Sequence, residues 1–112
     1  PELTATQRAT LSRSKRIANP GCYPTGFIAL VRPLRERDLL AADAALTVHA
    51  VSGYSGGGRK MIETYEQPTP ETRPANFGAY GLNLEHKHLA EMREHALLDT
   101  KPVFSPSVGY FE

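Results

Sequence analysis

Apolar residues recur at helical spacing in the first third of the chain, directly after a turn rich in proline and glycine. They predict a helix over about residues 23–36, with a core face made of Phe27, Leu30, Val31 and Leu34. Pro33 lies inside this pattern, and we expect it to kink or end the helix near Arg32 because proline has no amide hydrogen to donate. The first predicted element is therefore an amphipathic helix with a break close to its end.

A second helical pattern occupies about residues 85–95. Leu89, Met92 and Ala96 mark its inner face. His95 lies away from that face, so we expect its side chain to be exposed. A shorter helix is expected over about residues 61–66.

Two other stretches predict strands. Residues 45–51 are rich in β-branched side chains and predict a buried strand, in which His49 is expected to be a structural, packed residue. Residues 102–111 predict another strand, and Pro106 implies that this strand is an edge strand or carries a bulge. The stretches between them predict a proline-rich loop over residues 67–76 and a short extended piece over residues 77–84.

The composition fits one small globular unit with a modest core, because 40% of the 112 residues are hydrophobic and 22% are charged. The formal net charge of +1 implies no strongly basic face for nucleic acid. No run of about 18 apolar residues occurs, so no transmembrane helix is predicted. The lone cysteine excludes an internal disulfide and fits a reducing, cytoplasmic compartment.

That cysteine lies in a rigid turn, Asn19-Pro20-Gly21-Cys22-Tyr23-Pro24-Thr25. Pro24 suits the first turn of a helix, where a missing N–H costs nothing, so Cys22 should lie at or just before a helix N-terminus. Backbone N–H groups and the helix dipole favour thiolate there, and thiolate attacks carbonyl carbons. The alternative is a buried cysteine that packs as a small hydrophobe. The rigid setting argues against that alternative without excluding it.

A glycine-rich loop over residues 52–60, Ser-Gly-Tyr-Ser-Gly-Gly-Gly-Arg-Lys, directly follows the first strand. Between a strand and a helix, such a loop lets consecutive N–H groups point at an anion. The loop is not a P-loop, because the Gly-Lys-Ser/Thr ending is absent. The glycines alone are equally compatible with a flexible loop that binds nothing. Ser52, Ser55 and Arg59 favour contact with an anion or phosphate.

Two histidines, His86 and His88, precede or open the second predicted helix. A helix N-terminus disfavours imidazolium, so either ring can exchange a proton near neutral pH. Together with Cys22 they match no zinc-binding spacing, and we predict no metal site.

Three segments in order resemble the N-acetyl-gamma-glutamyl-phosphate reductase family. The cysteine turn is similar to its active-site signature, and residues 49–60, from His49 to Lys60, are similar to its second signature in the shorter subtype. Ala79-Tyr80 followed by His86-Lys87-His88 is similar to the third. One departure is Ala90, where members commonly have proline. Neither of the first two segments alone excludes the related aspartate-semialdehyde dehydrogenases, which share the fold and the cysteine chemistry and form the alternative family.

The resemblance implies an α+β fold like the C-terminal, catalytic domain of glyceraldehyde-3-phosphate dehydrogenase, with a mixed or antiparallel sheet and helices on one face. Residues 1–18 are polar and are expected to be a solvated connecting segment. Residues 19–112 are expected to be a partial catalytic and dimerisation domain with an incomplete sheet. The family's Rossmann domain is expected to lie outside this chain, because no Gly-x-Gly-x-x-Gly follows a strand here.

The resemblance also implies the reaction, an NADPH-dependent reduction of N-acetyl-glutamyl phosphate to the semialdehyde with release of phosphate, in arginine biosynthesis. Cys22 is then the nucleophile, and His86 is the acid/base with His88 in reserve. Backbone N–H groups in the turn shaped by Gly21 and Tyr23 can stabilise an oxyanion. NADP is the implied cofactor, held mainly by the missing domain, and the protein is expected to be a homo-oligomer.

The remaining site residues follow from the same resemblance. Binding of the anionic substrate is assigned to Ser52, Ser55, Arg59, Tyr80 and His88, and contact with the cofactor to Gly53, Gly56 and Gly57. A third reading is that the chain by itself is a non-catalytic module that binds an anion or assists assembly. In each case the isolated chain is expected to be inactive.

Overall fold

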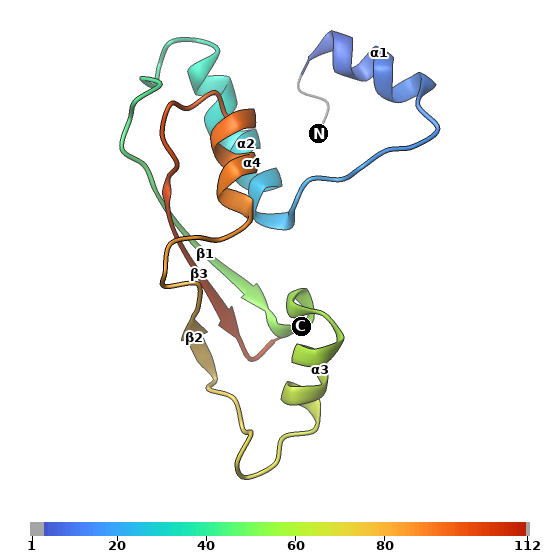
Figure 1. The fold of residues 1–112 in the computed structure, drawn as a ribbon, viewed down its shortest axis with the longest axis vertical. Helices are drawn as coiled ribbons and strands as arrows, with labels where there is room; N and C mark the ends of the chain where they lie inside the picture. The colour runs from blue at the N-terminus through green and yellow to red at the C-terminus, as the bar shows by residue number, and fades with distance from the viewer. Residues whose placement is uncertain (1–3, 112) are drawn as a thin grey trace. The chain divides into compact units, whose positions relative to one another are not determined.

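The structure, a computed structural model, describes residues 4–111 and divides them into two compact units. Unit 1 contains residues 4–44 and 87–101, and unit 2 contains residues 45–86 and 102–111. Each unit is therefore built from two separate pieces of chain. The elements in order are α1 (Ala5–Arg13), α2 (Cys22–Arg35), β1 (Thr47–Gly53), the 3₁₀ turn η1 (Tyr54–Gly57), α3 (Arg59–Glu66), β2 (Phe77–Ala79), α4 (His88–His95) and β3 (Val103–Gly109) (Figure 1).

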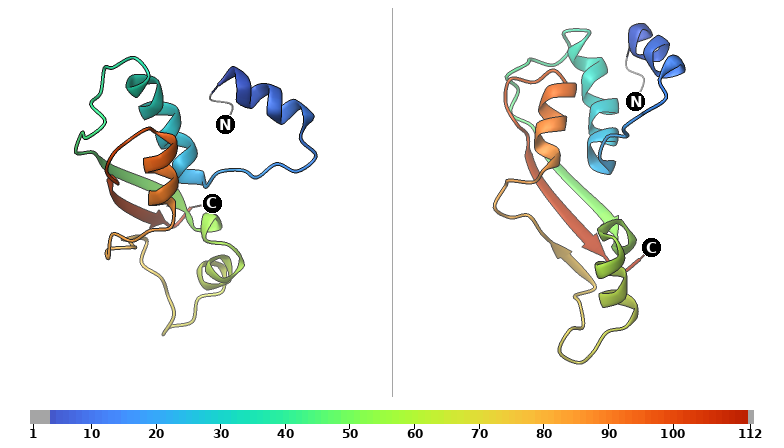
Figure 2. Two further views of the ribbon diagram at one scale, coloured as in Figure 1. Left: turned by 45° about the horizontal axis from the view of Figure 1, so that its top comes forward. Right: turned by 45° about the vertical axis from the view of Figure 1, so that its right-hand side comes forward.

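In unit 1, helices α2 and α4 lie side by side, as Figures 1 and 2 both show. The helices predicted over about residues 23–36, 61–66 and 85–95 are confirmed as α2, α3 and α4, with small changes at their ends. The buried side chains of the pair are Pro24, Phe27 and Ile28 on α2 and His88, Leu89 and Met92 on α4. Burying one large apolar side chain stabilises a fold by about 1.5–3 kcal/mol, so the apolar residues buried between α2 and α4 stabilise unit 1.

The core face predicted for α2 is partly wrong. Leu30 is 74% exposed and Leu34 is 43% exposed, whereas Ile28 is 1% exposed. The helical period is right, but α2 carries two apolar stripes, and the sequence does not show which of them contacts another element. Of the two outcomes predicted at Pro33, an end of the helix near Arg32 is also wrong, because α2 continues to Arg35.

Two arginines in the last turn of α2 hold the C-terminal end of the α2–α4 pair. The guanidinium of Arg32 donates to the carbonyl of His95 at 3.2 Å, and Arg35 Nε donates to the carbonyl of Leu97 at 3.0 Å. The last carbonyls of a helix have no intrahelical partner, so the bond to His95 satisfies a group that α4 leaves open, and the bond to Leu97 holds the turn that follows α4. Because C-terminal ends meet C-terminal ends, the N-termini of α2 and α4 lie at the same end of the pair.

The segment expected to be a solvated connector forms helix α1. Thr4 caps it, with its Oγ1 accepting from the Gln7 amide at 3.1 Å, and none of its residues is buried. The predicted exposure of this segment is confirmed, whereas its helical structure was not predicted. A connecting role for residues 1–18 stays a prediction, and residues 1–3 lie outside the described part.

Unit 2 contains a mixed three-stranded sheet with the order β1-β3-β2. β1 and β3 are parallel, with Thr47 facing Val103 and Gly53 facing Gly109. β2 is antiparallel to β3 and faces only its last three residues. The sheet and the helices confirm an α+β fold with a mixed sheet.

Pro106 lies in the central strand, so its predicted edge position is wrong. The Tyr80 amide donates to the Pro106 carbonyl at 3.0 Å, directly after β2 ends at Ala79. In an antiparallel pair of this kind the two residues exchange two hydrogen bonds, and proline can accept one but donate none. The proline therefore falls where β2 stops, and the central strand tolerates it.

His49 is exposed on β1, so the prediction of a packed histidine is also wrong. Side chains of β1 alternate between exposed and half-buried instead of being buried throughout. Within residues 4–111, β1 pairs with β3 on one side only. A strand at the edge of a sheet buries less of its side-chain surface than a central one.

Three tyrosines connect the loop after β1 with the end of β3. Tyr54 and Tyr65 are buried and stack with ring centroids 5.0 Å apart, and the Tyr110 hydroxyl donates to the Tyr65 carbonyl at 3.0 Å. Stacked aromatic pairs contribute about 0.5–1.5 kcal/mol beyond area burial. This cluster fixes η1 and α3, which flank the glycine-rich loop.

None of the helices described between residues 4 and 111 combines the length and the apolar character needed to cross a membrane.

Candidate active site

Cys22 is the first residue of α2, and its thiol is free and exposed. The predicted place at a helix N-terminus is confirmed, with Pro24 in the first turn. Exposure contradicts the alternative of a cysteine buried for packing. The first amides of a helix lack intrahelical acceptors, so the Cys22 amide belongs to the set of groups that attract negative charge at this end.

His88 packs directly against the residue before the cysteine. A Cβ atom built on Gly21 would lie 2.4 Å from His88 Nε2, closer than any real contact. The Tyr23 ring meets the same imidazole edge-on, with centroids 6.0 Å apart. Residues on both sides of Cys22 therefore contact His88, and position 21 has room for glycine alone.

Glu91 holds the same turn through its backbone. Its Oε2 accepts a hydrogen bond from the Gly21 amide at 2.9 Å, and Glu91 lies in the first turn of α4. Backbone N–H groups of this turn were predicted to stabilise an oxyanion, and the Gly21 N–H already donates to the Glu91 carboxylate. Donation to an oxyanion falls to the first amides of α2 itself.

Burial lowers the pKa of His88 below its ordinary value of 6.5; the Glu91 carboxylate opposes this effect and Lys87 adds to it. A buried imidazole loses hydration that its charged form needs, so the neutral form is favoured. A neutral ring can accept a proton, which is the state that a general base requires.

We expect protonation of His88 to destabilise the fold at acidic pH. The unfolded chain binds the proton at a higher pH than the folded chain does. The stability that the neutral His88 ring provides is therefore complete above about pH 6.5, and it is lost as the pH falls towards the folded-state pKa. In the full-length protein, His88→Asn should flatten the pH dependence of the thermal unfolding midpoint below that value. The matched variant His95→Asn changes an exposed histidine at the other end of α4 and should leave the dependence unchanged. Equal slopes in all three proteins would contradict the expectation.

The glycine-rich loop belongs to unit 2 and has the predicted strand–turn–helix form. Ser52 and Gly53 end β1, Ser55, Gly56 and Gly57 lie in η1, and Arg59 opens α3. A Cβ on Gly57 would lie 2.3 Å from Met61 Sδ, so packing accounts for glycine at that position. Gly56, Gly58 and the two cations that follow are exposed. Exposed glycines followed by two exposed cations suit the phosphate groups of a dinucleotide or of an acyl phosphate.

The other two predicted site residues, Tyr80 and His86, also belong to unit 2. Their rings have centroids 6.1 Å apart, and His86 meets Phe104 edge-on at 5.1 Å. His86 is half-buried. The two histidines that the sequence treats as a pair thus lie in different units, His86 beside the sheet and His88 at the cysteine turn.

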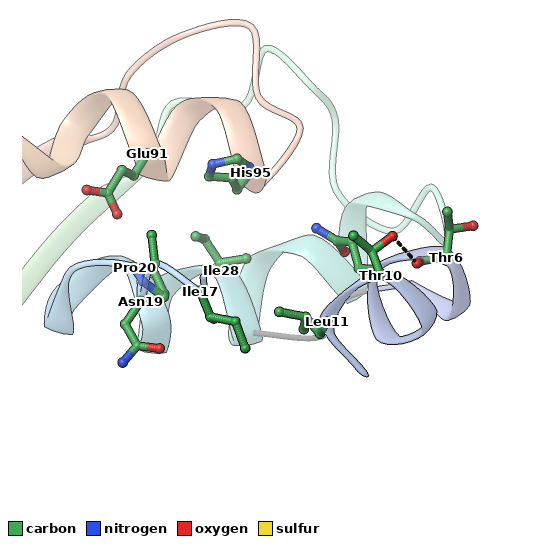
Figure 3. A pocket seen from close by; sticks show the side chains of 11 residues that line it. Thr6, Thr10, Leu11, Ile17, Asn19, Pro20, Ile28, Glu91 and His95 are labelled. Atoms are coloured by element: carbon green, nitrogen blue, oxygen red, sulfur yellow. Dashed lines mark hydrogen bonds between the residues drawn. The ribbon is translucent and has the colours of Figure 1, made fainter. Parts of the chain in front are cut away.

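Unit 1 also contains a pocket of about 590 Å³ beside the cysteine turn (Figure 3). Figure 3 shows that the side chains of Glu91 and His95 face it from α4, and Ile28 faces it from α2. The other lining residues are Thr6, Gln7, Thr10, Leu11, Ile17, Ala18, Asn19 and Pro20. Neither Cys22 nor His88 lines it, so this pocket is not the site of the predicted chemistry.

No group of three or more His, Cys, Asp or Glu side chains gathers as a metal site within residues 4–111. The one residue of the site that the sequence analysis missed is Glu91. A glutamate in the first turn of a helix is a detectable signal, but its partner lies 70 residues away in sequence. Sequence pattern alone does not predict that pairing.

Comparison with known proteins gives consistent matches. Residues 22–112 match the family described as semialdehyde dehydrogenase, dimerisation domain. Over 111 residues the chain is 54% identical to a Brucella anthropi protein named N-acetyl-gamma-glutamyl-phosphate reductase. Proteins of the same name from Brucella suis and Brucella canis are 53% and 52% identical. No solved structure matches the chain.

These alignments cover 98% of this chain and 36% of each relative, so the chain spans about a third of the length of the curated relatives it matches. The relatives carry the name of the family that the three motifs resemble, which confirms that resemblance. With the family match extending over residues 22–112, the chain belongs to the semialdehyde dehydrogenase dimerisation-domain family.

Proposed function

We propose that this chain supplies the nucleophile of an N-acetyl-gamma-glutamyl-phosphate reductase. The full-length protein reduces N-acetyl-glutamyl phosphate to N-acetyl-glutamate semialdehyde and phosphate, a step of arginine biosynthesis. The observation that carries the proposal is the exposed Cys22 thiol at the N-terminus of α2, with His88 packed against the preceding residue. The names of the relatives supply the substrate.

In the first step the Cys22 sulfur attacks the acyl carbon of the acyl phosphate. A carbon–sulfur bond forms, the carbon–oxygen bond to phosphate breaks, and a thioester remains on Cys22. The attack requires the thiolate form of Cys22. The first amides of α2 are proposed to stabilise the negative charge that develops on the acyl oxygen. NADPH, when bound, supplies the hydride for reduction. Collapse of the resulting thiohemiacetal breaks the carbon–sulfur bond, releases the aldehyde and regenerates the Cys22 thiolate.

A histidine holds and returns the proton in this cycle. His88 contacts both neighbours of Cys22 and has a lowered pKa, so its neutral ring can take the proton of the thiol or of the thiohemiacetal hydroxyl. His86 was the first choice from the sequence resemblance, and its role stays a prediction. The contacts of unit 1 support His88.

The glycine-rich loop and Tyr80 are proposed to bind the anionic groups. Ser52, Ser55 and Arg59 suit the substrate phosphate, and the backbone at Gly53, Gly56 and Gly57 suits the cofactor. The chain resembles part of the glyceraldehyde-3-phosphate dehydrogenase-like catalytic domain, and NADP is held mainly by residues outside it. The family description supports a homo-oligomer.

The reaction is tested in reverse with the full-length protein. We expect NADP⁺ reduction with N-acetyl-glutamate semialdehyde to require phosphate, since phosphate attacks the thioester. Aspartate semialdehyde should react at least about a hundredfold more slowly in kcat/KM, because the acetyl-amide group gives contacts that the smaller substrate lacks. Preference for aspartate semialdehyde would favour the related dehydrogenases. Absence of activity with both, together with thermal stabilisation by phosphate, would favour the non-catalytic anion-binding module.

A further inference from the structure

Glu91 contacts the cysteine turn although it lies on the neighbouring helix. Its half-buried side chain extends from the first turn of α4 and accepts the Gly21 N–H at 2.9 Å. Gly21 is the N-cap of α2 and has no side chain to cap that helix. The bond joins residues 70 positions apart, so it fixes two segments that local sequence leaves independent.

The same glycine has a second contact with α4. The Gly21 Cα faces the His88 ring without room for a methyl group, and His88 begins the helical turn in which Glu91 lies. Gly21, the residue before Cys22, therefore donates a hydrogen bond to one side chain of α4 and packs against another. Any shift of Glu91 moves the cysteine turn relative to the imidazole.

We propose that Glu91 is a positioning residue for the cysteine chemistry: its hydrogen bond to the Gly21 amide keeps the Cys22 turn and the His88 ring in place during the acyl-transfer and reduction steps. This inference rests on the proposed reductase function. Glu91 acts through Gly21 and His88 and contacts no reacting atom. What the role requires is the reach of the side chain and its acceptor oxygen, not its charge.

Reach and charge are separable by substitution. Glu91→Gln keeps the length and a carbonyl oxygen acceptor and removes the charge. Glu91→Asp keeps the charge and shortens the side chain by one methylene, so it fails to reach the amide. Glu91→Ala removes both. Glu94→Ala is the matched control, because Glu94 lies on the same helix and its side chain is 71% exposed.

In the full-length protein we expect Glu91→Ala and Glu91→Asp to lower kcat by about 10²-fold with little change in KM, since misplacement of a reacting group by about 1 Å has that effect. Glu91→Gln should stay within roughly fivefold of the original kcat, because a neutral acceptor replaces a charged one. Glu94→Ala should be unchanged. Rescue by glutamine and not by aspartate is the distinguishing result.

Three outcomes would overturn the inference. Activity retained by aspartate and lost in glutamine would assign the role to charge. A lower thermal midpoint with unchanged kcat in all variants would make Glu91 purely structural. The third uses hydrogen–deuterium exchange, which needs no activity: the Gly21 amide should exchange about tenfold faster in Glu91→Ala, and unchanged exchange would remove the bond on which the inference depends. An inactive unsubstituted protein would instead reject the proposed function, and amide exchange would still decide whether Glu91 holds the turn.

Discussion

On the proposed function, Cys22→Ser is expected to lower kcat of the full-length protein by about 10⁴-fold or more, the scale seen when a covalent nucleophile is removed. A serine hydroxyl has a far higher pKa than a thiol, and the N-terminus of α2 cannot ionise it near neutral pH. The substituted oxygen also forms an ester, which transfers its acyl group less readily than a thioester. The change in size is small and the position is exposed.

Folding should therefore be unaffected, with a free energy of unfolding within about 0.5 kcal/mol of the original protein. Phosphate-dependent reduction of NADP⁺ measures the activity, and circular dichroism on heating measures the fold. Iodoacetamide should inactivate the unsubstituted protein in step with labelling of the peptide that contains Cys22. A serine variant that retains a tenth of the activity would exclude Cys22 as the nucleophile.

Gly21→Ala and Gly26→Ala are expected to change stability in opposite directions. At position 21 the new Cβ would lie 2.4 Å from His88 Nε2, so the imidazole must move away from the cysteine turn. The φ of −59° and ψ of 155° at Gly21 suit alanine, so the penalty is steric. Overpacking of this kind costs about 1–3 kcal/mol. We expect kcat to fall by about 10²-fold as His88 shifts.

At position 26 a Cβ meets nothing within 4 Å, and the residue is exposed in the interior of α2. Alanine there should raise the free energy of unfolding by about 0.5–1 kcal/mol, because glycine in a helix interior is conformationally costly. Activity should be unchanged. Chemical denaturation and steady-state kinetics of the full-length variants test both positions, and a similar loss at positions 21 and 26 would contradict the steric argument.

Local patterns were sufficient to predict most elements of this fold. The spacing of Phe27 and Val31, the Pro24 signal and the β-branched run before Gly53 each act over a few residues, where helix and strand preferences operate. The predictions that are wrong depend on partners. Leu30 and Leu34 have the period of a core face, but both are exposed, and Ile28 is buried instead. Pro106 is tolerated in the central strand β3 because β2 ends at Ala79, which lies 27 residues earlier in the chain.

In the candidate site, too, local features could be predicted from the sequence and contacts between distant residues could not. Cys22 could be predicted because the turn around it encodes its own geometry, and the glycine-rich loop because it lies between a strand and a helix. The separation of His86 from His88 could not, because the chain passes from unit 2 to unit 1 between them. Neither could the occupation of the Gly21 amide by Glu91, which arises from tertiary packing alone.

The division of unit 1 into two pieces of chain has a consequence for synthesis. Cys22 leaves the ribosome well before His88 and Glu91, and the whole of residues 45–86 is made in between. Contacts of such long sequence separation form late, because the entropy of closing the intervening loop must be overcome first. The nascent protein therefore carries an exposed cysteine without its histidine until residues 87–101 have emerged. The contacts of His88 and Glu91 with the cysteine turn can therefore form only when the second piece docks, which links assembly of the candidate site to completion of the fold.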